Sequence, residues 1–135
     1  MNAEIVAVGS ELLTPQRSDT NSLYLTEQLN GLGVEVVGKS VVGDDRERLT
    51  AIVKAALARS EIVILTGGLG PTEDDVTRDA VAAALDRRQA FRPEILEAIE
   101  QRFRRLDRKM AEINRRPAFL LEGAEALRND QGTAP

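Results

Sequence analysis

The sequence contains no cysteine, no histidine and no tryptophan among its 135 residues. The absence of cysteine excludes disulfides, thiolate nucleophiles and cysteine-ligated zinc. Without histidine there is no imidazole base or ligand, so any bound metal would be held by oxygen atoms, which favours hard cations such as Mg²⁺ or Mn²⁺. Aromatic residues make up only 3% of the chain, which argues against a base-stacking surface for single-stranded nucleic acid.

Charge and hydropathy exclude further classes of protein. The formal net charge is −4 at pH 7, so nothing points to nucleic acid or an anionic membrane as partner. No apolar run approaches the length of a membrane span, and the N-terminal apolar stretch lacks a basic flank and contains Glu4, unlike a signal peptide. The composition, 42% hydrophobic and 30% charged, predicts one globular domain over residues 1–135, located in the cytoplasm.

Two hydrophobic periods alternate along the first two thirds of the chain. Continuous apolar runs predict strands buried on both faces at residues 5–8, 34–42 and 62–65. Amphipathic patterns predict helices at residues 20–32, 46–60 and 76–85, the second of them capped by Asp44 or Asp45. This βαβαβα order predicts a doubly wound α/β fold with a mostly parallel sheet.

The last third of the sequence predicts a long helix and a short strand. The helix spans Pro93–Met110, with an apolar side made by Ile95, Ile99, Phe103, Leu106 and Met110. A strand and turn are predicted within residues 118–127. The segment 102–116 holds seven basic residues against two acidic ones. This excess is either a patch that reaches toward phosphates or, as is more common, a solvated helix face.

The stretch GGLGPTEDDVT, residues 67–77, directly follows the third predicted strand. Ligands of open parallel sheets bind beyond the carboxyl ends of the strands, and polar loops follow all three strands here. Gly67, Gly68 and Gly70 allow backbone N–H groups to approach a ligand closely. A helix beginning near Asp75 would add the positive end of its dipole. The stretch therefore predicts a cradle for a phosphate-bearing ligand.

Three carboxylates in the same stretch would repel such an anion. In one interpretation Asp75 caps the helix, with Thr72 and Asp75 as a capping-box variant, and the other two carboxylates face solvent. In the other, Asp74 and Asp44 hold a divalent cation, Mg²⁺, Mn²⁺ or Co²⁺, whose charge reverses the local field. The glycine spacing matches neither the Walker motif nor the dinucleotide-binding fingerprint.

Several of these motifs together resemble those of one known protein family. GGLGPTEDDVT, the preceding VGDD and the N-terminal VGSELL…DTN resemble the molybdopterin-binding domain family. The Leu-Gly-Pro-Thr in the loop is similar to its CinA branch of competence/damage-inducible proteins, whereas MoaB- and MogA-like enzymes typically have Gly-Gly-Thr-Gly there. The resemblance implies a three-layer α/β/α domain. For this branch it also implies a metal-dependent pyrophosphatase that hydrolyses ADP-ribose to AMP and ribose 5-phosphate.

The closing segment EGAEALRNDQGTAP is also similar to a family motif, with two departures. Leu121 stands where the family usually has proline. The sequence stops at Pro135, inside a motif that normally continues, so we expect a domain truncated at its C-terminus. The resemblance implies a pocket built from Gly67, Gly68, Gly70, Thr72, Asp74, Asp75, Asp44, Glu11, Asn21, Asn114, Gly123, Asn129 and Gly132.

The expected mechanism assigns roles to these residues. Asp74, assisted by Asp44 or Asp75, holds the metal on the pyrophosphate, and the glycine N–H groups stabilise the developing oxygen charge. Glu11 or Asp75 is the base, because the chain has no histidine. Asn21 and Thr72 orient phosphate or ribose. The plainer alternatives are that Glu11 caps the following turn and that Asn21 is an ordinary helix-start residue.

Two other functions stay open at this point. One is molybdopterin binding with adenylyl transfer, as in the wider family. The other is a non-catalytic nucleotide-binding or oligomerisation module. In each case the expected partner is a small molecule, ADP-ribose or a molybdopterin-like compound, rather than nucleic acid or a membrane. Family members commonly self-associate, so a homo-oligomer is expected.

Overall fold

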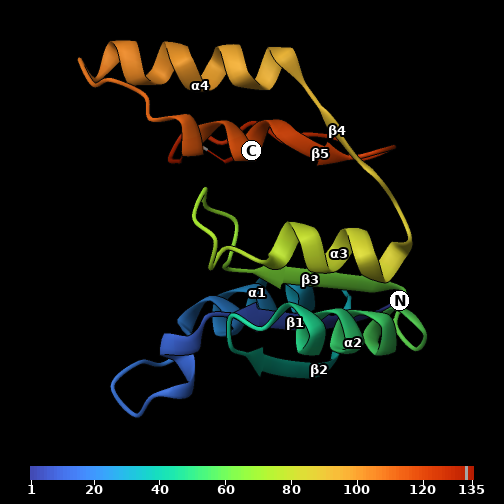
Figure 1. Ribbon diagram of the computed structural model, residues 1–135. Coiled ribbons are helices and arrows are strands. Elements are labelled where there is room, and N and C mark those ends of the chain that lie inside the picture. Colours follow the sequence, from blue (N-terminus) through green and yellow to red (C-terminus); the bar gives the residue numbers. More distant parts are fainter. Residues whose placement is uncertain (133) are drawn as a thin grey trace.

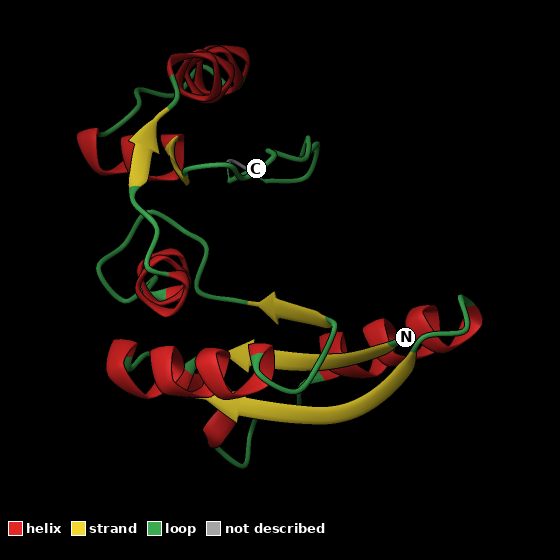
Figure 2. Cartoon of the chain, turned by 90° about the vertical axis from the view of Figure 1, so that its right-hand side faces the viewer, coloured by secondary structure: helices red, strands yellow, loops and turns green. Residues whose placement is uncertain are grey.

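The computed structural model describes residues 1–132 and 134–135. Its N-terminal part is a parallel sheet with strand order β2-β1-β3, and the three strands run in the same direction in Figure 2. The strands are β1 (Asn2–Val8), β2 (Glu35–Val42) and β3 (Ile62–Thr66). All three predicted strands exist, but the prediction that each is buried on both faces is wrong for β2, whose alternate residues are exposed because it lies at the edge of the sheet. β1 begins at Asn2 rather than Ile5 because its pairing with β2 starts at Asn2, opposite Glu35, and the charged Glu4 is buried within it.

Helices cover both faces of this sheet, as the three-layer prediction requires. They are α1 (Thr20–Gly31), α2 (Arg46–Leu57) and α3 (Thr77–Leu85), and a short 3-10 helix, η1 (Ser10–Leu13), precedes α1. Successive β1 side chains enter opposite layers. Ile5 packs with Leu29 of α1, whereas Val6 packs with Leu49 of α2 and Ala80 of α3. The α/β/α arrangement is therefore confirmed.

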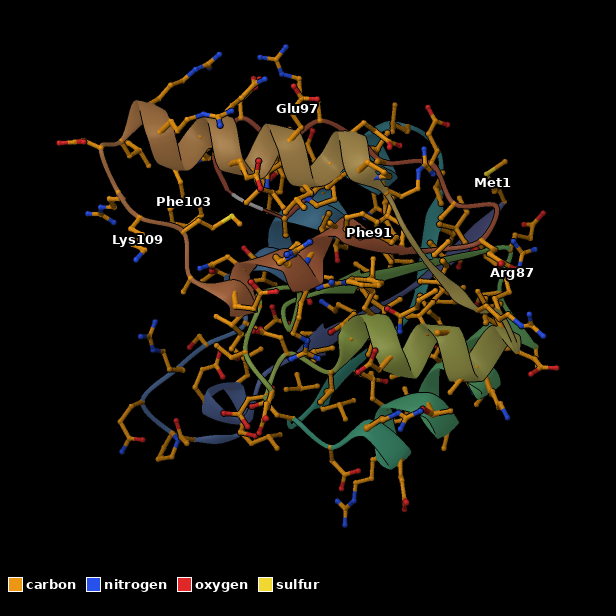
Figure 3. All side chains as sticks on the ribbon, turned by 45° about the horizontal axis from the view of Figure 1, so that its top comes forward. Met1, Arg87, Phe91, Glu97, Phe103 and Lys109 are labelled. Atoms are coloured by element: carbon orange, nitrogen blue, oxygen red, sulfur yellow. The ribbon has the colours of Figure 1, made fainter. Side chains whose placement is uncertain are left out.

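The remaining elements form a second lobe beside α3 (Figure 1). They are β4 (Gln89–Phe91), α4 (Pro93–Arg105), the 3-10 helix η2 (Glu112–Ala118) and β5 (Phe119–Leu121). β4 and β5 pair antiparallel, separate from the main sheet. Ile95, Ile99 and Ala118 form the core of this lobe. Phe103 lies on the side of α4 that faces this core, and Glu97 lies on the opposite side (Figure 3).

The end of α4 corrects the prediction of a helix reaching Met110. Asp107 adopts the left-handed conformation, with φ 50°, and the Arg108 N–H donates to the Phe103 carbonyl at 3.0 Å. These two features end the helix at Arg105. Leu106, placed by the sequence on the apolar side of this helix, follows its last residue and is 57% exposed. Met110 still packs against the lobe core, but from the loop that follows the helix.

The other predicted boundaries are confirmed in part. Asp45, not Asp44, caps α2, and its carboxylate accepts from the Arg48 N–H at 3.0 Å. The strand predicted within residues 118–127 exists only over β5. Throughout the residues that the structure describes, no helix has the length and hydropathy needed to cross a bilayer.

Glu4 is a buried charge in the middle of the sheet. Its carboxylate accepts two hydrogen bonds from the Arg59 guanidinium and one from the Ser60 hydroxyl, all at 2.7 Å. The bonds from Arg59 and then from Ser60 lower the pKa of Glu4, although burial opposes them. Glu4 is therefore a satisfied carboxylate that joins β1 to the end of α2.

We expect Glu4→Gln to lower the free energy of unfolding by about 2 kcal/mol near neutral pH, because charge-assisted hydrogen bonds are lost. A carboxyl whose folded pKa is lowered stabilises the fold above its ordinary value of 4.5, and this contribution disappears as the pH falls through the folded pKa. Urea unfolding at about pH 7 and about pH 3 measures both effects. The difference between variant and wild type should shrink at the lower pH.

The matched control is Glu35→Gln, because Glu35 is an exposed residue at the start of β2. Its stability should stay within about 0.5 kcal/mol of wild type at both pH values. A loss in Glu4→Gln that is equally large at both pH values would contradict the linkage to this carboxyl.

Candidate functional site

The loops that follow β1 and β2 are tied together by reciprocal hydrogen bonds. The Gly9 N–H donates to the Val42 carbonyl at 2.9 Å. The Ser10 N–H donates to Asp44 Oδ2 at 3.0 Å, and the Asp44 N–H donates to Ser10 Oγ at 2.9 Å. The Asp44 carboxylate, predicted as a metal ligand, therefore also holds two strand ends in register.

The third loop, residues 67–76 and here called the glycine loop, presses against β1 and α3. Gly67 and Gly68 have φ values of 90° and 62°. A Cβ on Gly67 would lie 2.0 Å from the Val8 carbonyl oxygen, and one on Gly68 would lie 2.4 Å from Thr77 Oγ1. Thr77 is buried and donates its hydroxyl to the Gly67 carbonyl at 2.7 Å. Only glycine fits at either position.

A pocket opens beside this loop at the carboxyl end of the sheet. We call it the Gly67 pocket, and its lining residues are Val8, Glu11, Leu12, Arg17, Ser18, Asp19, Thr20, Asn21, Thr66 and Gly67. Asn21 Nδ2 donates to Thr66 Oγ1 at 3.3 Å, which joins the start of α1 to the end of β3. The structure thus brings together three predicted site residues, Glu11, Asn21 and Gly67.

Arg17 is a pocket residue that the sequence analysis did not single out. It lies in the loop between η1 and α1, two residues before Asp19, which caps α1 by accepting from the Ser22 N–H at 3.0 Å. Its guanidinium contributes positive charge to the pocket wall. The sequence did offer a sign of this role. Arg17 stands two residues before the helix cap Asp19, in a loop at the ligand-binding edge of the predicted sheet.

Asp75 has a different role from the predicted helix cap. α3 begins at Thr77, with Val76 at the N-cap position and no side-chain cap bond. The Asp75 carboxylate instead accepts from the Thr72 N–H at 2.8 Å and the Thr72 hydroxyl at 2.6 Å. Burial raises the pKa of Asp75, but the hydrogen bonds from Thr72 and Gly70 and the charge of Arg116 together lower it.

This geometry changes the meaning of the carboxylates after the glycines. Gly70 and Thr72, expected to contact the ligand, donate to Asp75. Asp75 is therefore the anion around which the second half of the glycine loop folds. Gly67, in the first half, is the glycine of this loop that lines the pocket.

The two predicted cation ligands lie on different loops, Asp44 after β2 and Asp74 after β3. Asp74 is exposed on the glycine loop, whereas an oxygen of Asp44 accepts from the Ser10 N–H. Within residues 1–132 and 134–135, no group of three or more His, Cys, Asp or Glu side chains is arranged to hold a metal ion. Mg²⁺ is usually held by one or two carboxylates together with substrate phosphate oxygens and several waters, so these two residues alone would not complete its coordination shell.

The predicted residues of the closing segment lie elsewhere. Gly123 follows β5, and a Cβ there would lie 2.8 Å from Arg87 Nη1. Asn129 Oδ1 accepts from the Gly132 N–H at 3.0 Å, so these two residues build a turn of their own beside α4. Asn114 lies in η2. Along the described chain, none of these four residues lines the Gly67 pocket.

Comparison with known proteins supplies independent information. A family model described as "Probable molybdopterin binding domain" matches residues 4–135. A CinA-like protein of Solibacter usitatus is 64% identical over all 135 residues, and one of Koribacter versatilis is 53% identical over the same length. The chain covers 32% and 33% of these two proteins, so it spans about a third of the length of the curated relatives it matches.

Solved structures show the same fold. The protein CinA of Thermoplasma acidophilum superposes with a TM-score of 0.89 at 27% identity, over 99% of this chain and 78% of that one. The molybdopterin biosynthesis enzyme MoaB of Thermus thermophilus superposes with a TM-score of 0.60 at 23% identity, over 89% of this chain and 78% of that one. The similarity to MoaB, at 23% sequence identity, shows a shared fold only.

Proposed function

The chain belongs to the family of probable molybdopterin binding domains, and from this premise we propose that it binds a small phosphate-bearing pterin or nucleotide in the Gly67 pocket. The resemblance to CinA proteins is confirmed by the relatives and the fold. One observation carries the proposal. Gly67, held at φ 90° against β1, lines the same pocket as Asn21 and the cationic Arg17.

The chemistry of the pocket wall suits a ligand larger than phosphate. Arg17 offers a planar guanidinium for bidentate contact with phosphoryl oxygens. The start of α1, at Thr20 and Asn21, also lies in the wall, where the Asp19 carboxylate already accepts from the Ser22 N–H. The Glu11 carboxylate can only accept hydrogen bonds when ionised, so it suits a ribose hydroxyl or a pterin N–H. The wall therefore offers separate contacts for the phosphate and for an attached ring.

Calorimetric titration of the 135-residue chain tests this function. Molybdopterin and ADP-ribose are titrated separately, with inorganic phosphate as the minimal ligand. We expect saturable binding of at least one of the two large ligands and weaker binding of phosphate, because the ring contacts are absent. The comparison between molybdopterin and ADP-ribose identifies the ligand class. Failure of both to bind would overturn the proposal.

We expect Arg17→Ala to weaken binding of that ligand about tenfold, a change of about 1.4 kcal/mol, because a charged contact to phosphate is lost. Calorimetry measures the change. The thermal midpoint should stay the same, since Arg17 is exposed. Arg46→Ala, an exposed arginine at the start of α2, is the matched control and should bind as wild type does. Equal affinities in the two variants would remove Arg17 from the site.

A metal-dependent ADP-ribose pyrophosphatase is the second candidate function. It is favoured by the exposed Asp74 on the glycine loop and by Glu11 in the pocket wall. Asp74, with Asp44, would hold a divalent cation that supplies charge neutralisation at the pyrophosphate. Glu11 would then accept the proton of the attacking water. Release of free AMP distinguishes this hydrolysis from adenylyl transfer, in which the adenylyl group stays attached to the acceptor.

A further inference from the structure

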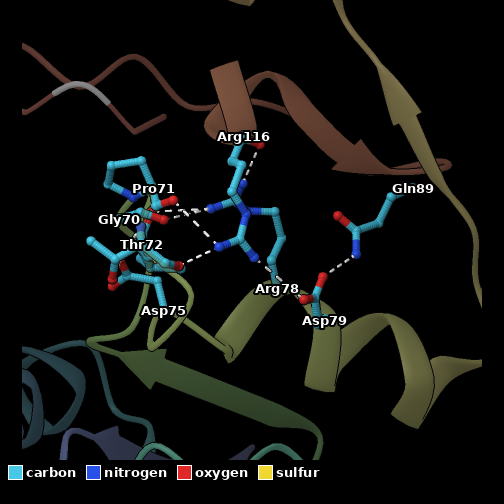
Figure 4. Close-up of polar contacts among 9 residues, drawn as sticks. Gly70, Pro71, Thr72, Asp75, Arg78, Asp79, Gln89 and Arg116 are labelled. Carbon is cyan, nitrogen blue, oxygen red and sulfur yellow. Dashed lines mark hydrogen bonds and ion pairs between the residues drawn. The ribbon is translucent and has the colours of Figure 1, made fainter. Parts of the chain in front are cut away.

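Two arginines hold the carbonyl side of the glycine loop (Figure 4). Arg78 projects from α3, and its Nη2 donates to the carbonyls of Leu69 at 3.1 Å and Gly70 at 3.3 Å. Its Nη1 donates to the carbonyl of Arg116 in η2. One side chain therefore connects the loop, the helix that follows it and the second lobe.

Arg116 completes the arrangement from the opposite side. Its Nη1 donates to the Pro71 carbonyl at 3.3 Å and to the Thr72 carbonyl. Its Nη2 lies 3.6 Å from Asp79 Oδ2, and Asp79 Oδ1 accepts from the Gln89 amide at 2.6 Å. Together the two guanidiniums bond the carbonyls of four consecutive loop residues, 69–72. We call these two side chains the arginine clamp.

The clamp brings two positive charges together in a partly buried place. Burial and the charge of Arg116 lower the pKa of Arg78, whereas Asp79 and Asp75 raise it. Two like charges are tolerated here because carbonyl oxygens and these two carboxylates carry the opposite charge. The loop carbonyls belong to no strand ladder or helix, so side-chain donors are free to bond them.

We propose that Arg78 and Arg116 are positioning residues for the ligand site. They hold residues 69–72 by the carbonyls, which keeps the adjoining Gly68 in its conformation and Gly67 in place at the pocket wall. Because Arg116 belongs to η2, the second lobe becomes part of the site without contacting the ligand. A ligand that orders the loop then also tightens the docking of the lobe, since coupling between two sites is reciprocal. The ligand-dependent part rests on the proposed function.

Hydrogen exchange in the absence of any ligand tests the clamp itself. We expect Arg116→Ala to speed exchange of the hydrogen-bonded amides of Thr72 and Asp75 about tenfold, while β1 amides keep their protection. Arg115→Ala is the matched control. Arg115 is the neighbouring exposed residue of η2, pairs with Glu112 and should leave the loop unchanged.

If Arg116→Ala does not fold, the conservative variant Arg116→Lys still tests the clamp. Arg116→Lys retains the charge but not the planar fork that bonds two carbonyls, so its loop exchange should fall between wild type and Arg116→Ala. If Arg116→Ala or Arg116→Lys gives the same loop exchange as Arg115→Ala, the clamp does not position the loop and the inference is overturned.

A second arm uses ADP-ribose as the probe. In wild type we expect ADP-ribose to slow exchange within η2 and β5, and in Arg116→Ala we expect about tenfold weaker binding with no protection of the lobe. Wild-type affinity in Arg116→Ala, together with faster loop exchange, would overturn the positioning role. Absence of ADP-ribose binding to wild type would count against ADP-ribose as the ligand of the proposed function and not against the clamp, because the ligand-free comparison stands by itself.

Discussion

Gly67→Ala is expected to cost at least about 3 kcal/mol of unfolding free energy and to abolish ligand binding. The added Cβ would lie 2.0 Å from the Val8 carbonyl oxygen, which is backbone in the central strand and cannot rotate away. The φ of 90° adds strain for any residue with a side chain. Urea unfolding followed by circular dichroism measures the stability, and calorimetry measures the binding.

Alanine substitutions at two other glycines provide the stability comparison for Gly67→Ala. At Gly31, the last residue of α1, a Cβ would meet nothing within 4 Å, so Gly31→Ala should be neutral or stabilise the protein by up to about 1 kcal/mol. Gly68→Ala should be less severe than Gly67→Ala, because its 2.4 Å contact is with the Thr77 hydroxyl rather than backbone. If Gly67→Ala were as stable as Gly31→Ala, the close packing of the loop on β1 would be wrong.

The layers of the fold were predictable because their signals are local. The apolar run at 62–65 and the stripe of Leu49 and Val53 in α2 each determine a period and a buried face within a few residues. The edge of the sheet where ligands bind follows from the parallel order. That reasoning placed Gly67 near Glu11 and Asn21, although Gly67 lies far from both in the sequence, and all three line one pocket.

The contact between the second lobe and the glycine loop could not be predicted from the sequence. Arg78 and Arg116 are separated by 38 positions, and their contact depends on how η2 docks beside α3. The basic segment 102–116 predicts a phosphate patch or a solvated helix face. Arg116 is neither, because it bonds loop carbonyls. Docking of this kind depends on packing between elements and leaves no periodic pattern in a single sequence.

Asp75 shows how a local motif can be correctly recognised and wrongly interpreted. The pairing of Thr72 with Asp75 exists, with the carboxylate accepting from the Thr72 N–H. The helix nevertheless starts later, at Thr77, whose hydroxyl bonds the Gly67 carbonyl. The same residues therefore close a loop instead of capping a helix. This outcome also removes the apparent conflict between the glycines and one of the carboxylates, since Asp75 is bound by the loop itself.

Asp74 and Asp75 are neighbours with separable predicted roles, and this makes hydrolysis testable. With Mg²⁺, Mn²⁺ or Co²⁺ added, we expect ADP-ribose to yield AMP, with chelator abolishing the release. Asp74→Asn should lower the rate at least about a hundredfold, because a carboxylate ligand of the metal is lost. It should leave the fold and metal-free ligand binding intact, since Asp74 is exposed. Chromatographic measurement of AMP gives the rate.

Asp75→Asn is the matched comparison, because it makes the same chemical change one residue away. It removes the charge that organises Thr72 and Gly70, so it should weaken ligand binding and speed exchange of the loop amides even without metal. If Asp74→Asn loses turnover but still binds the ligand, Asp74 is a metal ligand, and its role differs from that of Asp75, which organises the loop. Full turnover in Asp74→Asn would eliminate Asp74 as a metal ligand. Saturable binding without AMP release in wild type would leave the pocket a binding site and eliminate hydrolysis by this chain, because the site would then hold the ligand without activating water.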